Sequence, residues 1–157
     1  MNARYKIAVY LLAFIIVADQ MSKWWILSQI NMVPGRVEPI TSFFNIVLVH
    51  NRGVTFGLLN SLDHQWVTYA LIAVATIVVV LLGRWLMRTS FLSVTIALGS
   101  IMGGAIGNVI DRVRFGSVVD FLDFYYRDYH WPAFNLADSA IVVGVGLLLL
   151  DSMVRAK

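Results

Sequence analysis

Cysteine is absent from the 157 residues of this chain. Without a thiol, the protein has no disulfide, no thiolate ligand for a metal and no cysteine nucleophile. The absence of this one residue type therefore removes several chemistries at once.

Charged residues are scarce as well, at 13% of the chain against 59% hydrophobic residues. A soluble domain carries about 25% charged residues, so this composition indicates a membrane protein that lies in the lipid bilayer. Lysines and arginines give a net charge of +3 but form no basic run. We therefore expect no nucleic-acid partner, and we interpret the basic residues as topology signals.

Four apolar stretches predict four transmembrane helices, at about residues 7–27, 66–83, 91–110 and 137–154, in a single integral-membrane domain spanning 1–157. The second and third stretches hold runs of 18 and 20 residues without a charge, Trp66 to Gly83 and Phe91 to Ile110. These lengths match a hydrocarbon core of about 30 Å at about 1.5 Å per residue. The last uncharged run is short, so an aspartate at one of its ends must approach the apolar layer.

The first stretch also has the basic start and apolar core of a secretory signal peptide. Its small-residue cleavage site is weak, however, and apolar residues resume at Trp24 to Leu27. We therefore interpret it as an uncleaved helix.

Basic residues near the helix ends predict the orientation. One side of a four-span arrangement holds Arg4, Lys6, Arg84, Arg88, Arg155 and Lys157. The positive-inside rule makes that side, with both termini, cytoplasmic. The other side holds the segments 28–65 and 111–136, and in the first of these Phe43 to His50 has the composition of a strand after turn signals at Pro34, Gly35 and Pro39. The predicted fold is thus a membrane all-α protein of four transmembrane helices, with a small extracytoplasmic β-containing segment between helices 1 and 2.

Polar residues gather on that outer side in five short groups. They are Asp19 to Lys23, Asn51 to Gly53, Asn108 to Arg112, Val118 to Asp123, and Asn135 to Asp138. Ionisable groups at membrane depth are costly and usually face a bundle interior or a wet cavity. Their convergence on one side predicts a functional site there.

Local spacing predicts several contacts. Asp19 and Lys23 are four residues apart, the spacing of an ion pair on one helix face. Gly99, Gly103 and Gly107 form a stripe along which another helix can approach closely. These features are equally typical of helix packing without any catalytic role.

Asp120 and Asp138 suggest the chemistry. Asp120 lies in the apolar run Val118 to Phe121, where ionisation is disfavoured without a compensating partner. Asp138 lies one turn into the last predicted helix, on one face with Asn135, and a structural role at the helix end is the alternative. Two such carboxylates that face one water can act as general base and general acid. That arrangement hydrolyses a peptide bond without a covalent intermediate.

Other catalytic motifs are absent or poorly placed. The chain has no His-Glu-x-x-His helix and no Gly-x-Ser-x-Gly turn, and Ser22 and Lys23 are adjacent and point about 100° apart on a helix. Two alternatives to the aspartate pair remain open. Oxygen ligands for Mg²⁺ could come from Asp111, Asp120, Asp123 and Asp138, as in a transferase that acts on a lipid phosphate. The same carboxylates could also serve a non-enzymatic ion or proton pathway.

Five motifs in order resemble the bacterial lipoprotein signal peptidases, or signal peptidase II. They are Asp19-Gln20-Met21-Ser22-Lys23, Asn51-Arg52-Gly53-Val54-Thr55-Phe56-Gly57, Gly103 to Arg112, Val118-Val119-Asp120-Phe121 and Phe134-Asn135-Leu136-Ala137-Asp138-Ser139. The resemblance implies an aspartyl endopeptidase of the inner membrane that removes the signal peptide of a prolipoprotein before its diacylglyceryl-modified cysteine. It also implies binding of the antibiotic globomycin, and neither a metal nor a cofactor is expected.

By the same resemblance, Asp120 and Asp138 are the catalytic pair. The residues implied to surround the site or bind substrate are Asp19, Lys23, Asn51, Gly53, Asn108, Arg112, Asn135 and Ala137. Val54-Thr55 departs from the family's usual pair of alanines and so bears on substrate fit, while Asp123 lies outside the pattern. The segment from Ser28 to Gln65 is interpreted as a platform or lid over the peptide.

Overall fold

The computed structural model describes residues 3–29, 37–53 and 64–156. Within this part of the chain, four helices are long and apolar enough to cross a membrane, judged by length and composition. They are α1 (Ala3–Gln29), α2 (His64–Arg88), α3 (Leu92–Phe115) and α4 (Leu136–Arg155). The four predicted spans are confirmed, and each helix continues beyond the apolar run that marked it.

Glycine sets how closely the helices approach α3. A methyl group at Gly99 would lie 3.1 Å from the backbone oxygen of Ala8 in α1. Gly103 likewise faces α1, and Gly104 on the neighbouring face lies against the backbone of Ala137 in α4. The predicted glycine stripe therefore packs helices, as small residues do in membranes, where no hydrophobic drive brings helices together.

The outer faces of the bundle are apolar. Val74, Ile77 and Val80 of α2 are each more than half exposed, as are Val142 and Val143 of α4. Exposed apolar surface on this scale is unfavourable in water and matches contact with lipid.

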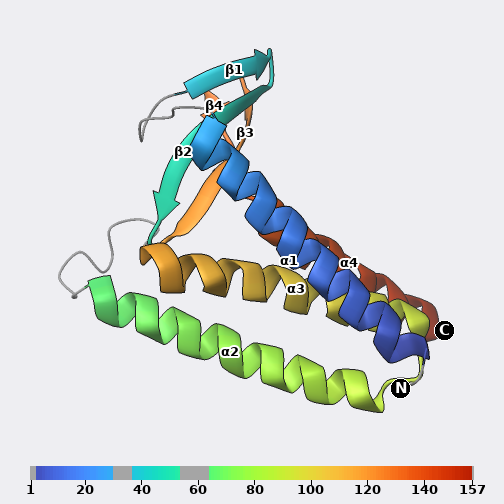
Figure 1. Ribbon diagram of the computed structural model, residues 1–157. Helices are drawn as coiled ribbons and strands as arrows, with labels where there is room; N and C mark the ends of the chain where they lie inside the picture. Colours follow the sequence, from blue (N-terminus) through green and yellow to red (C-terminus); the bar gives the residue numbers. More distant parts are fainter. Residues whose placement is uncertain (1–2, 30–36, 54–63, 157) are drawn as a thin grey trace.

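A small antiparallel sheet lies at the end of the bundle away from the chain termini (Figure 1). Its strands, in spatial order, are β1 (Val37–Thr41), β2 (Phe44–Asn51), β3 (Val118–Tyr126) and β4 (Tyr129–His130). The strand predicted at 43–50 is confirmed as β2. The prediction of a β segment between the first two helices alone was incomplete, because β3 and β4 follow α3.

The sheet is attached to the bundle through apolar side chains. Ile26, near the end of α1, packs with Leu48 of β2 and with Val119 and Phe121 of β3. All four side chains are buried. This contact fixes β3, and with it Asp120, against the helices.

The end of α3 sets where β3 begins. No proline interrupts α3, and Gly116 ends the helix with a left-handed φ of 70°. That conformation favours glycine, which has no Cβ to clash. Asp111 and Arg112 therefore lie inside α3, which continues to Phe115, beyond the predicted end of the third span at residue 110.

Candidate active site

Asp120 is the third residue of β3, and 1% of its surface is exposed. Its two carboxylate oxygens accept hydrogen bonds from different side chains. Asn135 Nδ2 donates to Oδ1 at 2.7 Å, and Asn51 Nδ2 donates to Oδ2 at 2.9 Å. The strand register places Val49 opposite Asp120, beside an irregularity between Ile46 and Val49. Such an irregularity re-aims side chains at functional sites.

Asp138 lies in the first turn of α4. Its Oδ1 accepts a hydrogen bond from Asn108 Nδ2 at 2.7 Å, and its Oδ2 accepts one from the backbone N–H of Asn135 at 3.3 Å. In return, Asn135 Oδ1 accepts the backbone N–H of Asp138 at 2.9 Å. This reciprocal pair is a capping box that begins the helix.

Two asparagines connect the carboxylates. Asn135 bonds both Asp120 and Asp138, and its side-chain amide also lies 3.2 Å from Asn108 Oδ1. Asn135 is fully buried, so the orientation of its amide is fixed by these partners. The structure thus brings together the two aspartates that the sequence singled out, from a strand and a helix start 18 residues apart.

The electrostatics differ between the two carboxylates. Burial raises the pKa of Asp120 to about 6, and the nearby charge of Asp138 acts in the same direction. The amides of Asn51 and Asn135 oppose this rise without cancelling it. Asp138 instead lies at a helix N-terminus, where the helix dipole stabilises negative charge. Burial therefore favours the protonated form of Asp120, which is the form that can donate a proton.

A second polar cluster lies beneath the pair and joins three helices. Lys23 Nζ of α1 lies 2.8 Å from Asp19 Oδ2, 2.8 Å from Asp111 Oδ2 of α3 and 3.2 Å from Asn108 Oδ1. Asp19 Oδ1 accepts the backbone N–H of Ala137 in α4 at 3.0 Å. The predicted pair of Asp19 and Lys23 is confirmed as one edge of this cluster.

Asn51 is oriented by the turn that follows it. Gly53 donates its backbone N–H to Asn51 Oδ1 at 2.8 Å, which leaves the Asn51 amide aimed at Asp120. Gly53 has a φ of 78°, a left-handed conformation that favours glycine. Val54 and Thr55, the departure from the family pattern, lie outside the described residues, as do Pro34, Gly35 and much of the expected lid.

Arg112 lies beside the pair without bonding it directly. Within the described residues, its guanidinium donates one hydrogen bond, from Nη1 to the backbone oxygen of Asn108 at 3.4 Å. Its Nε is buried and has no partner there.

Two supporting residues, Gln20 and Asp111, belong to the motifs noted in the sequence but were not among the residues expected to surround the site. Asp111 Oδ2 pairs with Lys23 and accepts the backbone N–H of Val119 at 3.1 Å, which ties α3 to β3. Gln20 Nε2 donates to Asp111 Oδ1 at 2.8 Å. The available signal was spacing, because Asp111 is three residues from Asn108 and Gln20 is three residues from Lys23.

The four carboxylates considered as magnesium ligands do not form one group. Asp111 pairs with Lys23. Asp123 accepts a hydrogen bond from Asn45 Nδ2 at 2.8 Å and pairs with His130 at 2.9 Å. Among the described residues, no three His, Asp or Glu side chains form a cluster that could hold a metal ion. The donor geometry therefore does not fit the set of ligands that this alternative requires.

Four apolar helices, a small sheet at one end, and one buried and one half-buried carboxylate joined by Asn135 describe a multi-span membrane protein with a candidate site at the sheet end. The family model described as signal peptidase (SPase) II matches residues 11–154. The chain belongs to the signal peptidase II family.

Individual relatives agree with this assignment. A lipoprotein signal peptidase of Solibacter usitatus is 44% identical over 151 residues, covering 92% of this chain and 88% of that protein. One from Burkholderia vietnamiensis is 46% identical over 145 residues, covering 91% and 85%. A bacterial membrane enzyme solved by the in meso method at 2.3 Å superposes with a TM-score of 0.81 at 27% identity, covering 96% of this chain and 89% of the other.

Proposed function

We propose that this protein is an aspartyl endopeptidase that removes the signal peptide of prolipoproteins, cutting before the diacylglyceryl-modified cysteine. Membership of the signal peptidase II family and the names of the relatives support the substrate class. One geometric observation carries the mechanism: Asn135 bonds both Asp120 and Asp138, and so holds two carboxylates in different electrostatic surroundings.

In this mechanism Asp138 is the general base and Asp120 the general acid. Asp138 takes a proton from a water whose oxygen attacks the scissile carbonyl carbon, while Asp120 donates its proton to the carbonyl oxygen. The tetrahedral diol collapses when Asp138 passes its proton to the amide nitrogen and Asp120 recovers one from a hydroxyl. Both carboxyls then regain their starting protonation states, and no covalent intermediate forms.

The raised pKa of Asp120 supports this assignment of roles. A carboxyl with a pKa of about 6 keeps part of its population protonated near neutral pH, as a general acid must. Asp138, in the first turn of α4, is left with the role of the base.

The membrane fold suits this substrate. A diacylglyceryl group cannot leave the bilayer cheaply, since each buried methylene contributes about 0.8 kcal/mol. The scissile bond therefore approaches laterally within the bilayer. We place the protein in the bacterial inner membrane, with the sheet and the site at the periplasmic face. Both termini lie at the opposite end (Figure 1), which we assign to the cytoplasm. Globomycin is expected to compete for the same site.

The decisive experiment is cleavage of a diacylglyceryl-modified precursor peptide by purified wild type, Asp120→Asn and Asp138→Asn. Each variant should insert and fold but lose cleavage, because an amide neither accepts nor donates the required proton. Asp123→Asn is the matched control, since Asp123 lies on the same strand but bonds Asn45 and His130. It should retain activity.

Two further arms separate the alternatives. Wild-type cleavage should persist in chelator, and globomycin should inhibit it. Full activity in either catalytic variant would end the assignment of the pair, and loss of activity in chelator that Mg²⁺ restores would favour the metal-dependent alternative.

A further inference from the structure

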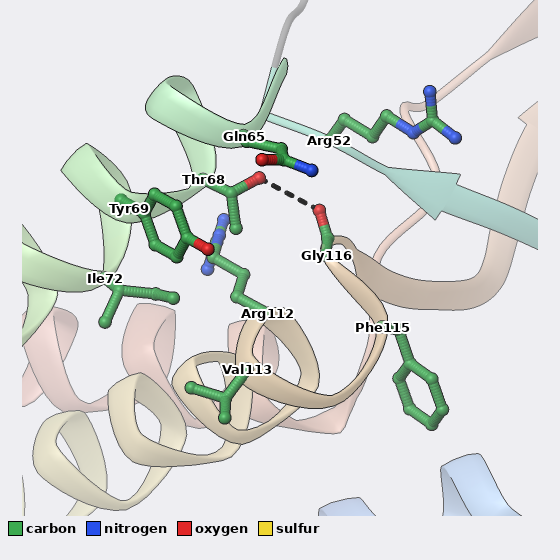
Figure 2. Close-up of a pocket in the computed structure, with 9 residues that line it drawn as sticks. All are labelled: Arg52, Gln65, Thr68, Tyr69, Ile72, Arg112, Val113, Phe115 and Gly116. Atoms are coloured by element: carbon green, nitrogen blue, oxygen red, sulfur yellow. Dashed lines mark hydrogen bonds between the residues drawn. The ribbon is translucent and has the colours of Figure 1, made fainter. Parts of the chain in front are cut away.

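Beside the aspartate pair, a cavity of about 510 Å³ lies between the end of β2, the start of α2 and the end of α3. Figure 2 shows its lining. Arg112 rises from α3 between Thr68 and Tyr69, while Arg52 lies near the end of β2 with its guanidinium directed away from Tyr69. Two arginines therefore line the cavity from different elements, and the guanidinium of Arg52 points away from the side where Arg112 and Tyr69 lie.

The charged side chains that line this cavity, among the described residues, are all positive. Two arginines and no carboxylate line it among the residues that the structure describes. Arg52 forms no ion pair or hydrogen bond within the same part of the chain. Among the residues that the structure describes, Arg112 makes one hydrogen bond, of 3.4 Å, and its Nε has no partner. Guanidinium groups with unused donors are suited to a carboxylate.

Of the two arginines, Arg52 is better placed to bind a ligand. The charge of Arg112 is balanced in part by the nearby carboxylates of Asp138, Asp120 and Asp111. Arg52 follows Asn51 directly, and Asn51 holds Asp120 at 2.9 Å. A group that binds Arg52 therefore contacts the residue next to the one whose side chain bonds Asp120.

We propose that Arg52 is a specificity residue that binds an acidic side chain in the segment following the modified cysteine. This inference rests on the proposed function. The part of the substrate before the cut is an apolar signal segment in the bilayer and supplies no anion. The segment after the cut leads toward water at the sheet end of the bundle, where Arg52 directly follows β2.

The test compares two diacylglyceryl peptides that differ only by Asp or Asn within the first residues after the modified cysteine. Cleavage is measured in a phosphate-free non-ionic detergent, so that no lipid phosphate competes for the arginine. Wild type should favour the Asp peptide by about fivefold in kcat/KM, mainly through KM, as expected for a partly exposed ion pair. The preference should shrink at high salt.

Three variants make the test specific. Arg52→Gln should bring the ratio of the two kcat/KM values close to one, and Arg52→Lys should retain part of the preference. Arg127→Gln is the matched control, since Arg127 lies in the turn after β3 and stacks on Tyr126. It should keep the wild-type ratio, which excludes a general effect of positive charge.

Each outcome bears on the proposal. Equal cleavage of both peptides by wild type, or an unchanged ratio in Arg52→Gln, would overturn the role of Arg52 and leave the peptidase assignment intact. A preference that appears only when anionic phospholipid is added would assign Arg52 to a lipid headgroup and also overturn it. Cleavage of neither peptide would count against the peptidase function itself, and the inference would fall with it.

Discussion

Asn135 and Asp138 hydrogen-bond each other in both directions, with the Asp138 N–H at 2.9 Å from Asn135 Oδ1 and the Asn135 N–H at 3.3 Å from Asp138 Oδ2. The same asparagine donates its amide to Asp120 at 2.7 Å. One residue thus begins α4 and orients both carboxylates. Helix capping and the proposed positioning for catalysis coincide at this position, and substitutions can separate them.

Asn135→Ser tests that separation. Serine caps a helix about as well as asparagine, so the change of cap should alter the free energy of unfolding by only a few tenths of a kcal/mol. The lost amide hydrogen bond should lower it by about 1 kcal/mol. Cleavage should fall on the order of 100-fold, because Asp120 loses the donor that fixes its carboxylate. The measurements are kcat and the thermal midpoint of unfolding in detergent. Asn135→Ala should add the loss of a cap, about 1 kcal/mol. Near-normal kcat in the serine variant would show that Asn135 acts only as a cap.

Asp120→Asn should stabilise the protein while abolishing cleavage. The pKa of Asp120 is about 6 in the folded protein, against 3.8 for an aspartate in an unfolded chain. Between these values the folded state binds more protons than the unfolded state, so the free energy of unfolding falls as pH rises from about 4 to about 6. A pKa difference of about 2 corresponds to roughly 3 kcal/mol. A lost hydrogen bond offsets about 1 kcal/mol of this.

The measurement is the thermal midpoint of wild type and Asp120→Asn at pH 4 and at pH 7. The variant should be more stable at pH 7, by about 1–2 kcal/mol, and should show little or no advantage at pH 4. A variant that is less stable at both values would show that burial does not disfavour the Asp120 carboxylate.

Asn51 should set the alkaline limb of the pH profile. If Asp120 must be protonated, kcat/KM falls as pH rises through its pKa of about 6. The Asn51 amide stabilises the ionised form and so lowers that pKa. Asn51→Ala should therefore move the alkaline limb to higher pH while it weakens cleavage. Asn45→Ala is the control, since Asn45 lies on the same strand but bonds Asp123. If the alkaline limb of the Asn51→Ala profile stays at the wild-type pH, that limb does not reflect the titration of Asp120.

Local patterns predicted the helices and the contacts within them. The apolar runs identify four spans because a bilayer imposes length and composition on each segment separately. The ion pair between Asp19 and Lys23 follows from spacing on one helix. Both predictions use information that lies within about one span of sequence.

Contacts between distant segments could not be predicted in the same way. β3 pairs with β2 across about 70 residues, and the apolar run at Val118 to Phe121 does not by itself distinguish a strand from a loop. The same limit applies to Asp111, whose partner Lys23 lies on another helix. Their expected position on one side of the membrane paired Asp120 with Asp138 before the fold was known, and the resemblance to a family, not spacing, made that pair specific.

Lys23→Met should destabilise the bundle strongly. Lys23 is the buried cation between Asp19 and Asp111, both of which are fully buried. Its removal leaves two carboxylates without a counter-charge, and breaking a buried pair in this way costs about 3–5 kcal/mol. Adding Asp19→Asn and Asp111→Asn to Lys23→Met should recover part of the thermal midpoint, because no buried charge then remains in the cluster. A single variant with wild-type stability would show that the cluster contributes little.

Gly104→Ala should impair both packing and cleavage, because Gly104 lies against the first turn of α4. An added methyl group would collide with the backbone oxygen of Ala137 and with the Ile141 side chain. Overpacking of this kind costs about 1–3 kcal/mol, and the resulting movement of Asp138 should lower kcat by about tenfold or more. Gly146→Ala, on α4 itself, is the control. A methyl group there meets nothing within 4 Å, so activity should be unchanged and stability equal or slightly higher. Equal behaviour of the two variants in thermal unfolding and cleavage would show that α4 adjusts without moving Asp138.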